Sequence, residues 1–308
     1  NLTDGTLTID KAHLTVTADN QSRLYGQANP SLTQTISGFV NNENLASSGV
    51  SGTALGSTSA TATTNVGSAA IVASTSGLSA GNYDFTASST DGTLTIDKAH
   101  LTVTADNKTR LYGQANPTLT TTVSGFVNGE SASTAAGFAG AGTASTTAVA
   151  ATNVGTATIT AGAGTLAATN YDFANLTDGT LTIDKRPLTV SADAKAKTYG
   201  DANPALTYTV AADGAGTSRG RGTAGSLSGA RSTAADGTSA VSSYTIDTSA
   251  LANGNYLITA NNGVLTINQR PLTVSADAKT KNYGDANPAL TYTVAADGVG
   301  SSRGLVNG

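Results

Sequence analysis

Asp4–Asn20 reads DGTLTIDKAHLTVTADN, and the same residues return unchanged at Asp91–Asn107. Within this stretch the apolar Leu14 and Val16 alternate with threonines, which is the period-two pattern of a strand with one buried face. Threonine suits the other face, because its β-branched side chain fits a pleated strand and its hydroxyl bonds water. Strict alternation favours antiparallel sheets with one solvated face, so the stretch predicts an all-β fold.

The opening decamer, NLTDGTLTID at residues 1–10, is also found at Asn175–Asp184, in the middle of the chain. By the same alternation we expect Leu7 and Ile9 to point inward. We interpret residues 1–10 as the C-terminal strand of a preceding repeat, and the chain as a window cut from a longer array.

A seven-residue motif gives the period of the array. LYGQANP occurs twice, TYGDANP and NYGDANP follow, and successive tyrosines are separated by 87, 87 and 84 residues. Glycine permits unusual backbone angles and proline fixes φ, so we expect these positions to anchor each repeat. The expected anchors are Tyr25, Gly26, Pro30, Tyr112, Gly113, Pro117, Tyr199, Gly200, Pro204, Tyr283, Gly284 and Pro288.

A unit of about 85 residues can bury a small core of its own, so we predict domains in series. The expected boundaries are 1–10 for the end of a preceding repeat, then repeats at 12–97, 99–184 and 186–268, and a partial repeat at 270–308. A join of one or two residues leaves little freedom between neighbours, which predicts a semi-rigid string of domains.

Each complete unit holds short runs rich in Thr, Val, Ile and Leu, punctuated by Gly and Asn, with no sustained helical spacing. About six or seven strands per unit are typical of a small Ig-like β-sandwich. We therefore expect tandem Ig-like sandwiches in an elongated array. A β-grasp-like repeat is the alternative, if part of the variable middle is helical.

The stretch PLTVSADAKTKNYGDANPALTYTV at residues 271–294 carries a resemblance to a known family, together with the downstream Asn-Tyr and G-x-LTI segments of the complete copies. It resembles the MBG domain, a glycine-rich repeat common in secreted, filamentous-haemagglutinin-like bacterial adhesins. The first two joins read KAH where the commoner pattern is KRP, so those joins lack the stiffening proline. The resemblance implies a stalk or array at the bacterial cell surface or in the extracellular matrix, without enzymatic activity, and specifies no receptor.

Composition narrows the function classes. The net charge is −4 with 12% charged residues and no basic run, so we expect no nucleic-acid partner. No apolar stretch approaches 18 residues, so no membrane span is expected. The chain has no cysteine, two histidines and few glutamates, so it offers no nucleophile–base pair or close carboxylate pair. We predict no enzyme and no cofactor.

Four aspartates recur in phase near the domain joins, where carboxylates could bind calcium. They are Asp19, Asp106, Asp193 and Asp277. No DxDxDG-type cluster accompanies them, so hydrogen bonding at strand ends is the favoured interpretation.

Other in-phase residues have structural interpretations. The recurring tyrosines are expected to supply the aromatic core of each repeat rather than a sugar-stacking platform. Glu43 and Glu130 are the only glutamates and read as loop residues, and His13 and His100 read as polar residues of the joins.

Three functions remain open from the sequence. The first is a structural stalk of a secreted adhesin, which spaces a distal binding region, outside these residues, from the cell. The second is a segment of an extracellular matrix filament that associates laterally, as in biofilms, through polar faces or exposed strand edges. The third is a glycan- or ice-binding repeat.

Overall fold

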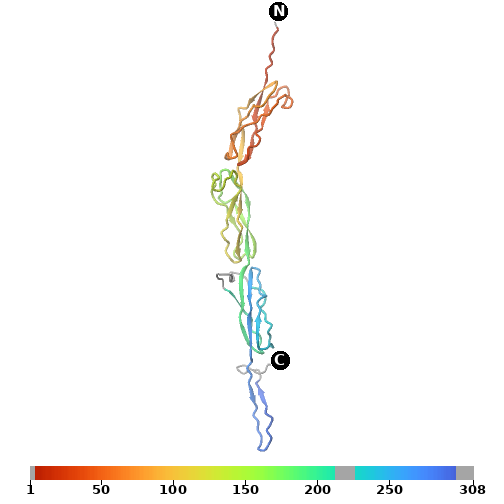
Figure 1. The fold of residues 1–308 in the computed structure, drawn as a ribbon, viewed down its shortest axis with the longest axis vertical. Coiled ribbons are helices and arrows are strands. Elements are labelled where there is room, and N and C mark those ends of the chain that lie inside the picture. Colours follow the sequence, from red (N-terminus) through yellow and green to blue (C-terminus); the bar gives the residue numbers. More distant parts are fainter. Residues whose placement is uncertain (1–3, 212–225, 296–308) are drawn as a thin grey trace. The chain divides into compact units, whose positions relative to one another are not determined.

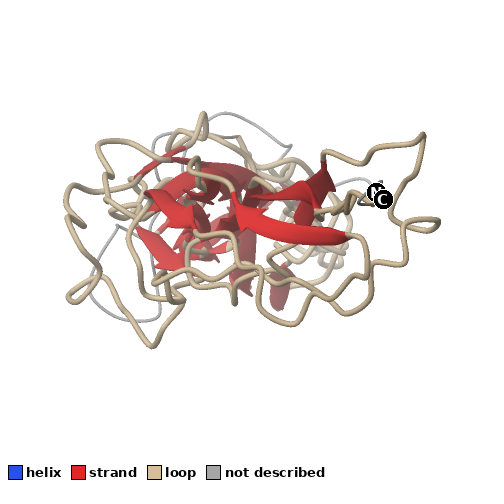
Figure 2. Cartoon of the chain, turned by 90° about the horizontal axis from the view of Figure 1, so that it is seen from above, coloured by secondary structure: helices blue, strands red, loops and turns tan. Residues whose placement is uncertain are grey.

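The computed structural model describes residues 4–211 and 226–295. These residues form strands, turns and loops without a helix (Figure 2), so the all-β expectation is confirmed for them. Accordingly, the described residues contain no apolar helix of membrane-spanning length.

The first repeat contains six strands, coloured red to orange in Figure 1. They are β1 (Ala12–Ala18), β2 (Gln21–Leu24), β3 (Gln34–Ser37), β4 (Gly67–Ile71), β5 (Tyr83–Ala87) and β6 (Gly92–Asp97). They form two three-stranded sheets, in the orders β3-β1-β5 and β2-β6-β4.

The later repeats follow the same plan. The second contains β7 (Ala99–Ala105), β8 (Lys108–Leu111), β9 (Thr121–Ser124), β10 (Thr143–Ser145), β11 (Gly155–Gly162), β12 (Tyr171–Thr177) and β13 (Gly179–Asp184). The third contains β14 (Arg186–Ala192), β15 (Lys195–Thr198), β16 (Tyr208–Val210), β17 (Ser243–Ile246), β18 (Tyr256–Asn261) and β19 (Gly263–Asn268). The fourth contains the described strands β20 (Val274–Ala276) and β21 (Tyr292–Val294), which pair with each other.

Each complete repeat mixes antiparallel and parallel pairing, so the antiparallel pairing that the alternation favoured holds for only some of the strand pairs. Strand β1 is antiparallel to β3 but parallel to β5, and β6 is antiparallel to β4 but parallel to β2. In the third repeat β14 and β18 are parallel, as are β15 and β19. Parallel neighbours need a long connection, and the whole middle of the repeat separates β1 from β5. Period-two alternation cannot reveal this, because it reports the buried face and not the direction of the partner.

The apolar faces of the two sheets meet in the core. Leu14 and Val16 on β1 are fully buried, as are Leu94 and Ile96 on β6, while the threonines between them are exposed or half-buried. The third repeat is built alike, since Ala192 of β14 packs on a core cluster that includes Leu265 of β19. The sandwich therefore rests on burial of aliphatic side chains, each contributing about 1.5–3 kcal/mol.

The opening decamer departs from the expected pattern. Leu7 and Ile9 are 85% and 86% exposed, whereas Leu181 and Ile183, in the identical decamer, are 0% and 1% exposed. Residues 4–10 belong to no strand, while Leu181 and Ile183 lie in β13, within a sheet. The prediction that Leu7 and Ile9 point inward is wrong here, because burial needs partner strands as well as the alternating pattern.

The chain divides into two compact units whose division runs through the second repeat. Unit 1 comprises Asn1–Lys108, Thr118–Thr146 and Thr158–Thr180, and unit 2 comprises Thr109–Pro117, Thr147–Ala157 and Leu181–Gly308. Within unit 1 a single core cluster includes Leu94 of the first repeat and Leu101 of the second. The junction between these repeats is therefore packed like a core.

Candidate functional site

The Tyr-Gly motif forms a tight turn, called the corner below, after the second strand of each complete repeat. In the first repeat the Gln27 amide donates to the Leu24 carbonyl oxygen at 3.2 Å, and Gly26 has a φ of 83°. A four-residue turn with positive φ at its third residue is a type II turn, which favours glycine there. The corresponding glycines also have positive φ: Gly113 at 79°, Gly200 at 84° and Gly284 at 94°.

A buried basic side chain holds the corner to the loop opposite. Arg23 donates from Nε to Asn29 Oδ1 at 2.8 Å, and Asn29 Nδ2 donates to the Ala60 carbonyl at 2.7 Å. Arg110 and Asn116 repeat this arrangement. The asparagine is the one before the motif's proline, so the ANP segment serves to fix the corner. The sequence signal is a basic residue two positions before each tyrosine, which the sequence interpretation missed.

The prolines that follow these asparagines have different surroundings along the chain. Pro30, Pro117 and Pro204 are half-buried, and Pro288 is exposed.

The joint between the first and second repeats is an aromatic contact within unit 1. Tyr25, from the first corner, packs edge to face on Tyr171, with ring centroids 5.6 Å apart and an interplanar angle of 81°. Both rings are buried. Glu130 lies between the two hydroxyls: Tyr25 donates to Oε1 at 2.8 Å, and Tyr171 donates to Oε2. One carboxylate thus links a tyrosine of each repeat.

This environment disfavours ionisation of both tyrosines. Burial, reinforced by the hydrogen bond to Glu130, raises the pKa of Tyr171 to about 12. Burial also raises the pKa of Tyr25, with a further contribution from Glu130. A phenolate beside a carboxylate in a poorly solvated site is unfavourable, so both hydroxyls remain donors well above neutral pH.

An asparagine pair completes the same joint. Asn170 is 1% exposed, and its Nδ2 donates to Asn65 Oδ1 at 2.9 Å. Its Oδ1 accepts from the Val66 amide at 3.1 Å. A buried side-chain amide costs free energy unless it is hydrogen-bonded, and here both ends of the amide are satisfied by the preceding repeat.

Glycine is required at the corner for a second reason. A Cβ at Gly26 would lie 2.3 Å from Val127 Cγ2, on the loop that precedes Glu130. Any larger residue would therefore push the two repeats apart as well as strain the turn.

The joint between the second and third repeats, within unit 2, has the same plan. Tyr112 packs edge to face on Tyr256 at 5.5 Å and 80°. Asn255 Nδ2 donates to Asn153 Oδ1 at 2.9 Å, and Asn255 Oδ1 accepts from the Val154 amide at 2.9 Å. A buried cation is added here, because Arg186 Nη1 donates to the Tyr112 carbonyl at 3.3 Å.

The remaining two corners have other surroundings. The Tyr199 carbonyl accepts from Arg270 Nη1 at 3.0 Å, and Asp201 pairs with the same nitrogen at 3.2 Å. The ring of Tyr199 is 36% exposed, and that of Tyr283 is fully exposed. The expectation that these tyrosines fill the core of their own repeat therefore needs correction: Tyr25 and Tyr112 pack against the following repeat, and Tyr283 is not in a core.

The four in-phase aspartates accept hydrogen bonds from threonines at the beginning of the neighbouring strand or just before it. Asp19, for example, accepts from Thr33 and Thr35, both at 2.7 Å. These bonds lower its pKa, and threonine bonds likewise lower the pKa of Asp106 and Asp277. The carboxylate oxygens thus already have partners, and Asp193 accepts from Thr207 in the same way.

In the parts of the chain that the structure describes, no group of three or more His, Cys, Asp or Glu could hold a metal ion. Calcium binding at the four aspartates therefore stays a prediction, and no cluster of carboxylates in the described residues supports it.

Two residues that the sequence placed in loops or joins take part in specific contacts. Glu130 bridges the two tyrosines, and its only sequence signal is its phase with Glu43. His100 of β7 pairs with Asp172 of β12 at 2.8 Å at the surface of the second repeat, although the sequence suggested only a polar linker.

Comparison with known proteins supports the repeat assignment. A family profile described as MBG domain (YGX type) matches residues 14–95, 101–182, 188–266 and 272–308. No curated protein matches the chain. Among solved structures, the chain is similar to the crystal structure of the N-terminal four Ig domains of Dscam1 isoform 9.44 with zinc. That similarity has 10% identity and a TM-score of 0.18, and covers 83% of this chain and 73% of the other.

Proposed function

The chain belongs to the family of MBG domains of the YGX type, present here as tandem repeats, and we propose that these repeats act as a semi-rigid spacer. The spacer would form part of a secreted adhesin at the bacterial cell surface. In that setting it holds a distal binding region, outside these residues, away from the cell. The observation that best supports this proposal is the buried contact between the first and second repeats. There the rings of Tyr25 and Tyr171 pack edge to face, and both hydroxyls donate to Glu130.

A spacer needs joints that resist bending. Lys98 alone separates β6 from β7, and Lys185 alone separates β13 from β14. Such short connections leave little slack, and the Asn65–Asn170 contact adds directional hydrogen bonds to the aromatic packing. Two independent restraints, one covalent and one packed, fix the orientation better than either one alone.

Small-angle X-ray scattering of the intact chain tests this proposal. The expected profile is that of an extended, stiff particle, and Tyr25→Ala combined with Tyr112→Ala should broaden the distribution of particle dimensions. Tyr25→Phe combined with Tyr112→Phe is the matched control, because the rings remain. A wild-type chain as variable in its dimensions as the double alanine variant would contradict the spacer.

The matrix-filament alternative uses the same repeats but adds lateral contacts. Strands β3 and β5 are the outer strands of their sheet, and an outer strand presents backbone groups that another chain can pair with. A concentration series by sedimentation velocity separates the two roles: a spacer stays monomeric, and a matrix filament grows with concentration.

A further inference from the structure

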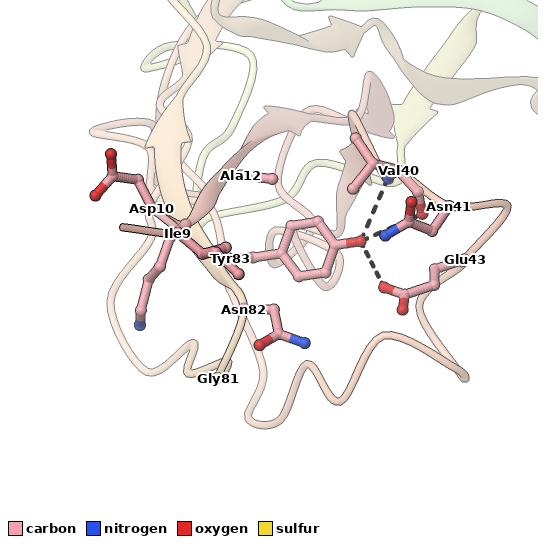
Figure 3. A pocket seen from close by; sticks show the side chains of 10 residues that line it. Ile9, Asp10, Ala12, Val40, Asn41, Glu43, Gly81, Asn82 and Tyr83 are labelled. Atoms are coloured by element: carbon pink, nitrogen blue, oxygen red, sulfur yellow. Dashed lines mark hydrogen bonds between the residues drawn. The ribbon is translucent and has the colours of Figure 1, made fainter. Parts of the chain in front are cut away.

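The first repeat carries an open pocket at the place where the second repeat holds its neighbour. The pocket has a volume of about 400 Å³ and is lined by the start of β1, the loop after β3 and the Asn-Tyr segment before β5. Figure 3 shows Tyr83 in it, with its hydroxyl directed at Val40 and Glu43. We call this pocket the first socket.

The first socket is built from the same residues as the occupied site in the second repeat. Val40, Glu43, Asn82 and Tyr83 occur there again as Val127, Glu130, Asn170 and Tyr171. Those four counterparts contact the Tyr25–Gly26 corner or the loop beside it.

The first socket is already arranged for the same contact. Tyr83 is buried and donates to Glu43 Oε2 at 2.5 Å, as Tyr171 donates to Glu130. Phe39 packs edge to face on Tyr83 at 5.9 Å, and the corresponding pair in the second repeat lies 5.6 Å apart. The aromatic wall and the carboxylate are thus in position without an occupant.

The hydrogen-bond partners that are missing in the first socket are those that a Tyr-Gly corner and its neighbouring loop supply in the second repeat. Among the described residues, nothing bonds to Oε1 of Glu43, whereas Oε1 of Glu130 accepts from Tyr25. The side chain of Asn82 is exposed and makes no hydrogen bond within the described ranges, whereas Asn170 is buried and bonded at both ends.

We propose that the first socket binds the Tyr-Gly corner of another MBG repeat joined N-terminally to Lys11. The tyrosine hydroxyl donates to Glu43, its ring packs on Tyr83, and the glycine lies against Val40. This inference rests on the proposed spacer function and deepens it, because it places one more joint ahead of the first repeat.

The join itself favours this occupant over a free corner from a second chain. Residues 10–13 read DKAH, identical to residues 97–100 at the occupied joint. Lys11 Nζ donates to the Ala80 carbonyl at 3.0 Å, and Lys98 Nζ donates to Ala168 at the same distance. A repeat ending at residue 10 therefore meets the first socket through the same connection.

The chain offers a direct test, because residues 1–10 are identical to residues 175–184. Placing residues 99–174 before Asn1 recreates a complete copy of residues 99–184, which carries its own Tyr-Gly corner. Hydrogen–deuterium exchange then follows peptides that span residues 40–43 and 81–84, because VNNE and GNYD each occur only once in this extended chain. We expect exchange there to slow by about tenfold or more relative to the parent chain.

Matched variants make the result specific. Tyr112→Ala made only in the added copy should restore the parent exchange rate, and so should Glu43→Ala in part.

Unchanged exchange at residues 40–43 in the extended chain would overturn the inference, as would protection that survives Tyr112→Ala. Rigid joints in the scattering experiment together with an unprotected first socket would refute this inference alone and leave the spacer intact.

Discussion

Two joints can be compared: the first lies between repeats one and two, and the second between repeats two and three. They have the same aromatic and amide contacts but differ in their charged residues. Both have an edge-to-face tyrosine pair and an asparagine whose side-chain amide is bonded to the preceding repeat; Asn170 is buried and Asn255 is half-buried. The first adds a carboxylate, Glu130, which accepts from tyrosine hydroxyls. The second adds a guanidinium, Arg186, which donates to a backbone carbonyl.

Comparing equivalent positions in the two joints shows which contacts both joints have and which residues differ between them. Ala99 in the first joint and Arg186 in the second are at equivalent positions. Ala99 is paired with Tyr171, and Arg186 is paired with Tyr256. One position later, the first joint has His100 paired with Asp172, and the second has Pro187 opposite Leu257. The aromatic and amide contacts are therefore the shared requirement, and the polar additions vary.

The largest expected effect comes from removing the shared ring. Tyr25→Ala and Tyr112→Ala should each lower the free energy of unfolding by about 3–5 kcal/mol, because each leaves a large cavity at a packed joint. Urea unfolding of the intact chain measures both losses. Similar losses of unfolding free energy would support the same role for the tyrosine at both joints. A loss below about 1 kcal/mol at either joint would show that the two joints do not depend on the same contact.

The corner glycine should come next. Gly26→Ala places a side chain at a φ of 83° and against Val127, and we expect a loss of about 2–4 kcal/mol from strain and overpacking together. Gly49→Ala is the control, because Gly49 has a φ of 71° with open space around it. Its loss should be only about 1–2 kcal/mol. Equal losses would mean that the approach of Val127 is irrelevant.

The two charged residues should behave differently in double-mutant cycles. Glu130→Ala and Arg186→Ala should each cost about 1–3 kcal/mol, because each leaves a buried partner without its hydrogen bond. Tyr25→Phe should couple to Glu130→Ala by more than about 0.5 kcal/mol. Tyr112→Phe should not couple to Arg186→Ala, because that arginine binds the carbonyl and not the hydroxyl. Coupling at the second joint would contradict the assigned roles.

Alkaline pH should weaken the first joint. The folded-state pKa of Tyr171, about 12, lies above the ordinary value of 10. The stability that this shift contributes is therefore complete below about pH 10 and lost as the pH rises through 12. Unfolding free energies measured from pH 8 to 12 should fall over that range, and Tyr171→Phe should flatten the decline. An equally steep decline in the phenylalanine variant would assign the loss to other groups.

The smallest effect is expected at the exposed ion pair. His100→Ala should change the unfolding free energy by no more than about 1 kcal/mol, because exposed pairs are weak and screened. Thermal unfolding at low and high salt would detect a larger contribution. A loss of unfolding free energy comparable to that of Glu130→Ala would mean that the His100–Asp172 pair also stabilises the joint.

The repeat period and the buried strand faces could be predicted from the sequence. Identical stretches fix the period, and alternation correctly places Leu14 and Val16 inside. The same rule fails for Leu7 and Ile9, because alternation states which face prefers burial and not whether a partner is present to cover it.

The joints could not be predicted, because their contacts cross from one repeat to the next. Tyr25 and Glu130 are 105 residues apart, and no local pattern connects a turn tyrosine with a glutamate in a later loop. The phase of the tyrosines did indicate that each has a fixed role. For Tyr25 and Tyr112 that role lies between repeats, since an in-phase residue can serve a boundary as well as a core.

The parallel pairing of β1 with β5 and of β2 with β6 bears on how a repeat meets mechanical force. Pulling the ends of a repeat apart draws β1 and β6 in opposite directions along their own axes. The hydrogen bonds of both parallel ladders, five residue pairs in one and four in the other, then share the force in shear and must break together. We therefore expect a repeat with this strand order to unfold under tension through a concerted rupture rather than by peeling open one bond at a time.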